Sequence, residues 1–115
     1  MIVKINNAYL KDLYEGNKVS GKPRYDNAVI KKFKKVIQIL NYVESSQRLY
    51  DFKGLHFEKL SGDRVGYYSC RVDLKYRLIL SIETDEILVE EIMIVEDLTN
   101  HYDLGSKPIE YTFLK

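Results

Sequence analysis

The sequence has few residues that form disulfides or break helices and strands, with one cysteine, two prolines and six glycines among 115 residues. A lone cysteine excludes an intramolecular disulfide and a cysteine-rich metal site, so stability must come from an apolar core. No stretch approaches the roughly 18 apolar residues of a membrane span, and the N-terminal apolar run is too short for a signal peptide. We therefore expect a cytoplasmic protein with no membrane partner.

The composition is that of one globular domain. Hydrophobic residues make up 45% of the chain and charged residues 30%, which is enough apolar material for a single core at this length. We expect one domain over residues 1–115, in which 104–115 is a C-terminal extension that adds a strand or docks on the core.

The net charge of +1 hides an asymmetry along the chain. Residues 1–36 carry nine Lys or Arg against three Asp or Glu, whereas residues 82–115 carry two against nine. This distribution permits a basic face for nucleic acid and an acidic face for another partner.

The first half of the chain predicts a short strand and two helices. Weak alternation over 2–5 indicates the strand, and the asparagines at 6 and 7 offer a cap for a helix over 8–15 that Gly16 ends. A polar loop follows, and Asp26 caps a second helix that runs to about residue 42.

The second helix is strongly amphipathic. At about 100° per residue its apolar side chains share one arc, and they are Val29, Ile30, Phe33, Val36, Ile37, Leu40 and Val43. The opposite arc carries Lys31, Lys32, Lys34 and Lys35. These lysines are either an ordinary solvated face or a contact for nucleic acid, and their position relative to an active site decides between the two.

The second half predicts a sheet. After a link over 45–51 that can form a helix, the apolar pattern changes to period two. We expect strands over 55–60, 66–72, 76–82 and 87–95, joined by short loops that favour antiparallel neighbours. The predicted fold class is therefore α+β, with a short N-terminal strand and two helices packed on one face of a mainly antiparallel sheet.

The loop centred on Leu74 brings two arginines together. A three-residue loop pairs Arg71 with Arg77, on the face opposite the apolar side chains that meet the helices. Like charges opposed in this way destabilise a hairpin unless both guanidinium groups contact an anion such as a phosphate. The alternatives are that acidic side chains from neighbouring strands neutralise the pair, or that a bulge breaks the register.

Few other residues suggest chemistry. His101 follows the last predicted strand and is either an acid or base at the rim of the sheet or a plain surface residue. His56 is expected to be structural or exposed. No metal-ligand spacing, phosphate loop or dinucleotide fingerprint is present, so we expect proton transfer without a metal or another cofactor.

Several motifs together resemble the HigB branch of the RelE/ParE toxin superfamily over about residues 1–103. They are Gly21-Lys22-Pro23-Arg24-Tyr25, the basic helix, Leu60-Ser61-Gly62-Asp63-Arg64-Val65-Gly66-Tyr67-Tyr68-Ser69, Tyr76-Arg77-Leu78-Ile79 and His101-Tyr102. The resemblance implies an endoribonuclease that enters the ribosomal A site, contacts ribosomal RNA and cuts messenger RNA, held inactive by a HigA-like helix-turn-helix antitoxin. In such toxins the ribose 2′-hydroxyl attacks the adjacent phosphate, so acid–base groups and cations suffice without a metal.

The resemblance also assigns roles to residues. Arg77 would stabilise the transition-state phosphate, and Arg71 beside it is expected to bind RNA. His101 and Tyr102 match a terminal cluster that positions and protonates, although related termini often run Asp-Tyr-His and this chain reads Asn100-His101-Tyr102-Asp103.

A second departure concerns the residues before the Gly-Asp-Arg block. Some HigB toxins carry a histidine where this chain has Glu58, beside Lys59. These departures leave two assignments open for acid and base, and in one of them Glu58 accepts the 2′-hydroxyl proton while His101 protonates the leaving oxygen. Lys59 is a further catalytic candidate. Arg64 would hold an RNA backbone or is an exposed turn residue, and the four helix lysines would bind ribosomal RNA electrostatically.

Two rival functions share these expectations. A ParE-like inhibitor of DNA gyrase has the same fold and needs no His101. A catalytically inactive member would only bind an antitoxin, through the acidic C-terminal third or by adding a partner strand to a sheet edge.

Overall fold

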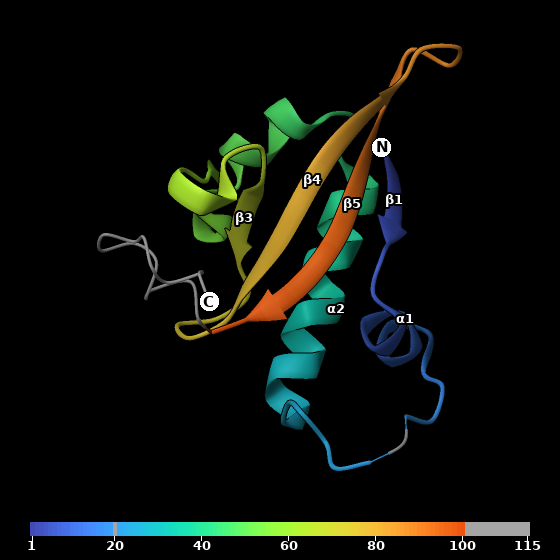
Figure 1. Ribbon diagram of the computed structural model, residues 1–115, viewed down its shortest axis with the longest axis vertical. Coiled ribbons are helices and arrows are strands. Elements are labelled where there is room, and N and C mark those ends of the chain that lie inside the picture. The colour runs from blue at the N-terminus through green and yellow to red at the C-terminus, as the bar shows by residue number, and fades with distance from the viewer. Residues whose placement is uncertain (20, 101–115) are drawn as a thin grey trace.

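The computed structural model describes residues 1–19 and 21–100, which contain one five-stranded sheet with its helices on one side (Figure 1). The strands are β1 Ile2–Ile5, β2 Glu58–Lys59, β3 Tyr68–Arg71, β4 Arg77–Asp85 and β5 Glu90–Thr99. Their order across the sheet is β1-β5-β4-β3-β2, with β1 parallel to β5 and the other neighbours antiparallel. The predicted α+β class and mainly antiparallel sheet are confirmed.

Both helices begin at their predicted caps. They are α1 Ala8–Glu15 and α2 Asn27–Tyr42. Asn7 Oδ1 accepts a hydrogen bond from the backbone N–H of Leu10, and Asp26 Oδ1 accepts one from that of Val29. α1 ends at Gly16, whose φ of +79° is a left-handed conformation that costs glycine little. No helix in the described ranges is long and apolar enough to cross a membrane.

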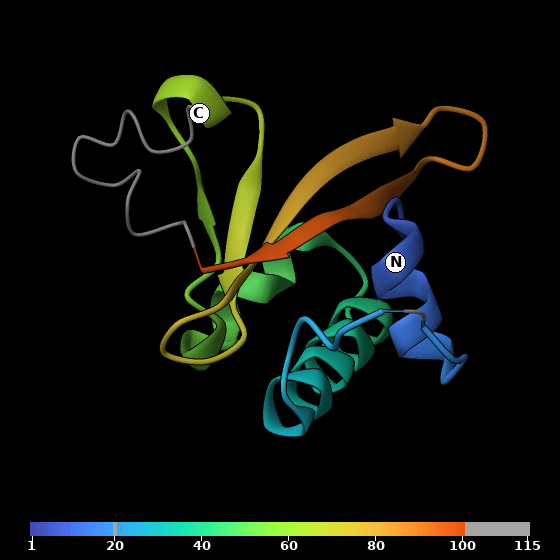
Figure 2. The same ribbon diagram turned by 60° about the horizontal axis from the view of Figure 1, so that its bottom comes forward.

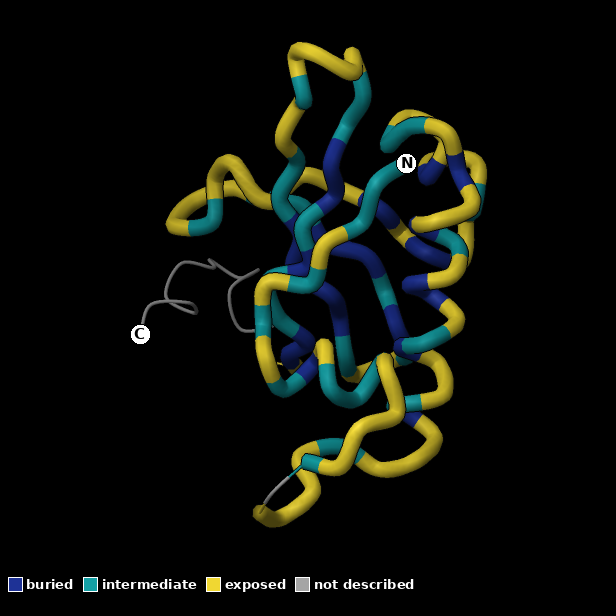
Figure 3. Tube along the Cα trace, turned by 90° about the vertical axis from the view of Figure 1, so that its right-hand side faces the viewer, coloured by how far each residue is buried: buried dark blue, intermediate teal, exposed yellow. Residues whose placement is uncertain are grey.

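The core lies between α2 and the sheet, where α2 crosses behind β4 and β5 in Figure 1 and buried backbone gathers in Figure 3. Six residues of the predicted apolar arc are buried, namely Val29, Phe33, Val36, Ile37, Leu40 and Val43. The strands supply Cys70, Val72, Leu78, Leu80, Met93 and Val95. Cys70 is fully buried, and burial raises the pKa of its thiol to about 12.

The predicted strand over 55–60 is wrong in its first half. Residues 53–55 form the 3₁₀ turn η2 (Lys53–Leu55), which follows the 3₁₀ helix η1 (Ser46–Asp51). His56 closes η2 with a φ of +47°, and this left-handed residue breaks the alternation that predicted a strand. Only Glu58–Lys59 pair as β2, and a third 3₁₀ turn, η3 (Gly62–Arg64), leads towards β3.

The predicted loop over 83–86 is also wrong. β4 continues to Asp85, and the chain turns within residues 86–89. Asp85 Oδ1 accepts hydrogen bonds from the backbone N–H groups of Ile87 and Leu88, each at 3.0 Å, and so fixes the turn three residues later than predicted.

Beyond the body of the sheet, β4 and β5 continue as a two-stranded ribbon (Figures 1 and 2). β3 pairs with β4 only as far as Leu80, and β1 reaches β5 only as far as Ile92. Residues 84–91, here named the acidic tip, pair only with each other. The tip exposes Ile87, Leu88 and Val89 at 91%, 61% and 84%.

Candidate functional site

The predicted arginine pair is present. Arg71 and Arg77 are Cα partners across the β3–β4 hairpin. The loop between them is closed by Asp73, whose Oδ1 accepts hydrogen bonds from the backbone N–H groups of Lys75 and Tyr76. Cys70 and Leu78, the next pair, are in the core, so alternation places both arginines on the sheet face opposite the helices.

Among the residues that the structure describes, three groups accept hydrogen bonds from the side chain of Arg77. Its Nε and Nη2 donate to Ser69 Oγ at 3.2 and 3.1 Å. Nη2 also donates to the backbone carbonyl of His56 at 2.8 Å and to Glu58 Oε2 at 3.1 Å. The acceptors come from β3, from the end of η2 and from β2, so three segments orient one guanidinium group.

The ion pair between Arg77 and Glu58 explains how the hairpin tolerates two opposed arginines. The bulge of β4 lies between Ile79 and Leu80, so the register at the pair is intact, and an acidic residue of a neighbouring strand neutralises Arg77. The repulsion from Arg71 is therefore relieved without an external anion. The side chain of Glu58 is 47% exposed and that of Arg77 only 9%, so the carboxylate is the accessible member of the pair.

Arg77, Arg71, Ser69 and Glu58 are here named the arginine cluster. The other candidate residues are not part of it. Lys59 follows Glu58 in β2 and is exposed, but alternation turns its side chain to the other face. Arg64 is half-buried in η3. His101 and Tyr102 lie outside the described residues.

The structure does not bring the α2 lysines to the arginine cluster, because α2 covers the opposite face of the sheet. Three of them are exposed and Lys34 is half-buried. Lys32 reaches the β3–β4 loop, where it lines a pocket of about 400 Å³ together with Lys75 and Tyr76.

The motif at 21–25 anchors the loop before α2. Tyr25 donates a 2.7 Å hydrogen bond to the carbonyl of Leu98 and packs edge-on against Tyr76. Arg24 lies over the ring of Tyr9 at 4.1 Å. Burial raises the pKa of Tyr25 to about 12, and the carboxylate of Asp97 adds to the shift.

Residues 3–93 match the family described as RelE-like toxin of the type II toxin–antitoxin system HigB. The chain belongs to this HigB-like toxin family. Membership implies that the toxin has a protein antitoxin as its partner. Among curated proteins, none matches the toxin in sequence.

Solved structures share the fold of the toxin. The YoeB/ParE toxin from Agrobacterium tumefaciens is similar over 89% of this chain and 100% of its own, with a TM-score of 0.56 and 19% identity. YafQ from E. coli strain BL21(DE3) is similar over 89% of this chain and 94% of its own, with a TM-score of 0.54 and 12% identity. At such identities the likeness extends to the fold alone.

Sequence reasoning about the toxin missed the role of Ser69. This residue is fully buried and accepts two hydrogen bonds from Arg77. A signal was available, because Ser69 stands two residues before Arg71 and therefore shares its face, while the apolar residues of β3 face the helices.

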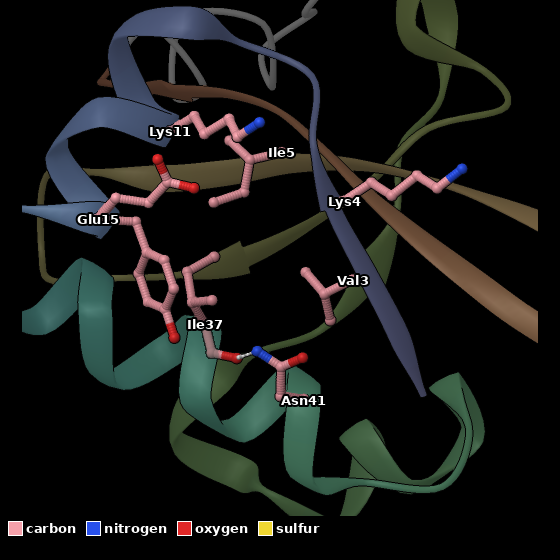
Figure 4. Close-up of a pocket in the computed structure, with 8 residues that line it drawn as sticks. Val3, Lys4, Ile5, Lys11, Glu15, Ile37 and Asn41 are labelled. Atoms are coloured by element: carbon pink, nitrogen blue, oxygen red, sulfur yellow. Dashed lines mark hydrogen bonds between the residues drawn. The ribbon is translucent and has the colours of Figure 1, made fainter.

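A pocket of about 430 Å³ lies between β1, α1 and α2 of the toxin, and none of the arginine cluster lines it (Figure 4). Its apolar walls include Val3, Ile5 and Ile37. The side-chain amide of Asn41 donates a hydrogen bond to the backbone carbonyl of Ile37 at 3.3 Å. This pocket is therefore separate from the candidate functional site.

Proposed function

We propose that this toxin is a ribosome-dependent endoribonuclease that cuts messenger RNA by attack of a ribose 2′-hydroxyl on the adjacent phosphate, without a metal. The observation that carries the proposal is the guanidinium group of Arg77, oriented by Ser69, His56 and Glu58 on the sheet face opposite α2. A fixed cation stabilises developing phosphate charge without having to reorganise during the reaction.

In the proposed reaction the 2′-oxygen forms a bond to phosphorus and the bond from phosphorus to the 5′-oxygen breaks. Glu58 accepts the proton of the 2′-hydroxyl, and His101 gives a proton to the leaving oxygen. The products are a 2′,3′-cyclic phosphate and a free 5′-hydroxyl. Arg77 holds the negative charge that develops on the phosphate oxygens, and Tyr102 positions the reacting groups.

In the proposed reaction, a substrate phosphate replaces Glu58 as the partner of Arg77. A substrate phosphate that approaches Nη2 competes with Glu58 Oε2, which lies 3.1 Å away. Because the Glu58 side chain is 47% exposed, it can turn from Arg77 towards the 2′-hydroxyl. Phosphate binding would then both occupy the cation and release the base.

The other cations contribute binding in this proposal. Arg71 and Arg64 hold the backbone of messenger or ribosomal RNA near the cluster. Lys31, Lys32, Lys34 and Lys35 contact ribosomal RNA in the A site from the helix side, an attraction that weakens steeply with salt. The antitoxin is a HigA-like protein.

The test is a cell-free translation reaction that contains the purified toxin, in which the 5′ ends of the messenger are mapped. Cuts at a constant phase within codons, with 5′-hydroxyl ends, support the proposal. Intact messenger together with inhibited supercoiling by DNA gyrase would favour the ParE-like function. A toxin that is folded but inactive in both assays would be a binding module for its antitoxin.

A further inference from the structure

Tyr67 extends the arginine cluster by one position along β3. The backbone N–H of Leu60 donates to the carbonyl of Tyr67 at 2.9 Å, which continues the β2–β3 ladder one residue past the pair Lys59 and Tyr68. Since side chains alternate, Tyr67 shares its sheet face with Ser69, two residues further on.

The two adjacent tyrosines have different environments. Tyr68 stacks on Phe57, with ring centroids 5.4 Å apart and planes 3° apart, and packs against the core. Tyr67 is 38% exposed, and within the ranges 1–19 and 21–100 no aromatic ring packs against it. Tyr67 and Lys59 also line a pocket of about 160 Å³. The ring of Tyr67 is thus exposed, and alternation places it on the sheet face that carries Arg71.

The spacing along β3 places three side-chain positions in a row on one sheet face. Two residues of a strand span about 6.6 Å, so Tyr67 and Arg71 each stand one such step from Ser69, the residue that holds Arg77. An aromatic ring, a buried guanidinium group and a second arginine therefore follow one another along one face.

We propose that Tyr67 stacks on the nucleobase next to the cleaved phosphate, with the RNA lying along β3. This inference rests on the proposed nuclease function and adds a substrate contact to it. Stacking on tyrosine accepts any base, because every base has a π face. Tyr67 contributes to binding of the RNA, whereas Arg77 acts on the reacting phosphate.

The test is single-turnover cleavage of messenger on programmed ribosomes at increasing toxin concentration. Tyr67→Ala should raise the half-saturating concentration roughly tenfold while the maximal rate stays within about twofold. Tyr67→Phe keeps the ring and should behave as the unmodified toxin. Tyr42→Ala is the matched control, because Tyr42 is 82% exposed at the end of α2, away from the cluster.

Urea unfolding of each variant shows that the compared proteins are equally folded. An unchanged half-saturating concentration for Tyr67→Ala, or a loss confined to the maximal rate, overturns the stacking role while the nuclease function stands. If the unmodified toxin cuts no messenger, the proposed function fails, and the stacking role, which depends on it, fails with it.

Discussion

β4 begins in a buried polar cluster and ends in an exposed acidic tip. At its start, Arg77 is 8% exposed and its donors meet acceptors from three segments. At its end, Asp85 and Glu86 are followed by three consecutive aliphatic residues that face solvent. Val89 among them has a φ of +52°, which is unusual for a β-branched residue.

The difference between the two ends shows how one ribbon can separate two kinds of contact. The carboxylates of Asp85, Glu86 and Glu90 repel RNA phosphates, whereas Arg71 and Arg77 attract them. An exposed aliphatic run is typical of contacts with protein, and it offers no charge or hydrogen bond to the phosphates of RNA. Cleavage should therefore depend on the start of β4 and be indifferent to its end.

The largest effect is expected at Arg77. Arg77→Ala should lower the single-turnover cleavage rate roughly a thousandfold, because it removes the cation that we propose stabilises the phosphate charge. It should also lower the free energy of unfolding by about 2 kcal/mol, since buried Ser69 Oγ and the His56 carbonyl lose their donor. Ribosome cleavage and urea unfolding measure the two effects.

A pair of variants separates catalysis from stability at this position. Arg77→Lys keeps the positive charge but loses the planar guanidinium group. This variant should cleave at least about tenfold more slowly than the unmodified toxin. Arg48→Ala removes an exposed arginine that pairs with Asp51 and should change neither quantity. Full activity of Arg77→Lys would show that the planar guanidinium group is not needed.

The next effect is expected at Glu58. Glu58→Gln keeps the shape of the side chain and removes its basicity, so cleavage should slow roughly a hundredfold. Stability should change by less than about 1 kcal/mol, because the ion pair is half-exposed on the carboxylate side. Glu90→Gln, at the other end of the ribbon, is the control. Equal rates for the two variants would remove Glu58 from the reaction.

The sequence predicted the local features of the fold well. The caps at Asn7 and Asp26 and the pairing of Arg71 with Arg77 follow from neighbouring residues, and the structure confirms all three. The β4–β5 turn was misplaced because Asp85, one acidic residue among several, is the one that accepts the turn hydrogen bonds.

The candidate site could be predicted only in part. Both Arg77 and Glu58 were identified from the sequence, but their contact joins residues 19 positions apart. The His56 carbonyl also accepts from Arg77, and no local pattern signals the left-handed conformation of His56. The position of Ser69 two residues before Arg71 signals their shared face, but its contact with Arg77 joins two strands and appears only in the folded structure. The roles of His101 and Tyr102 stay predictions.

A smaller effect is expected at the basic face of α2. Lys31→Ala with Lys35→Ala should weaken ribosome binding several-fold at low salt and reduce the salt dependence of binding by about one unit of slope per lost phosphate contact. Titration of labelled toxin onto ribosomes at several salt concentrations measures both. An unchanged slope would identify these lysines as a solvated face and leave the arginine cluster as the nucleic-acid contact.

A pH effect on stability is expected near the start of β4, where Tyr25 packs on Tyr76. The pKa of Tyr25 is raised from 10.0 to about 12 in the folded toxin, so folding favours its neutral form. The contribution of neutral Tyr25 to the free energy of unfolding is complete below pH 10 and is lost as the pH rises towards 12. Tyr25→Phe should show a shallower loss in urea unfolding across this range. Cys70 titrates equally in both proteins and cancels from the difference; identical pH profiles would contradict the assignment.

The smallest effect is expected at the acidic tip. Leu88→Ser with Glu86→Gln should leave the cleavage rate within about twofold and stability within about 0.5 kcal/mol, because both side chains project from a ribbon outside the core. The same cleavage and unfolding assays apply. A tenfold loss of cleavage with unchanged folding would end the contrast between the two ends of β4. The tip would then be part of the contact with the ribosome, and its carboxylates would have to face protein or bound cations there, because ribosomal RNA alone would repel them.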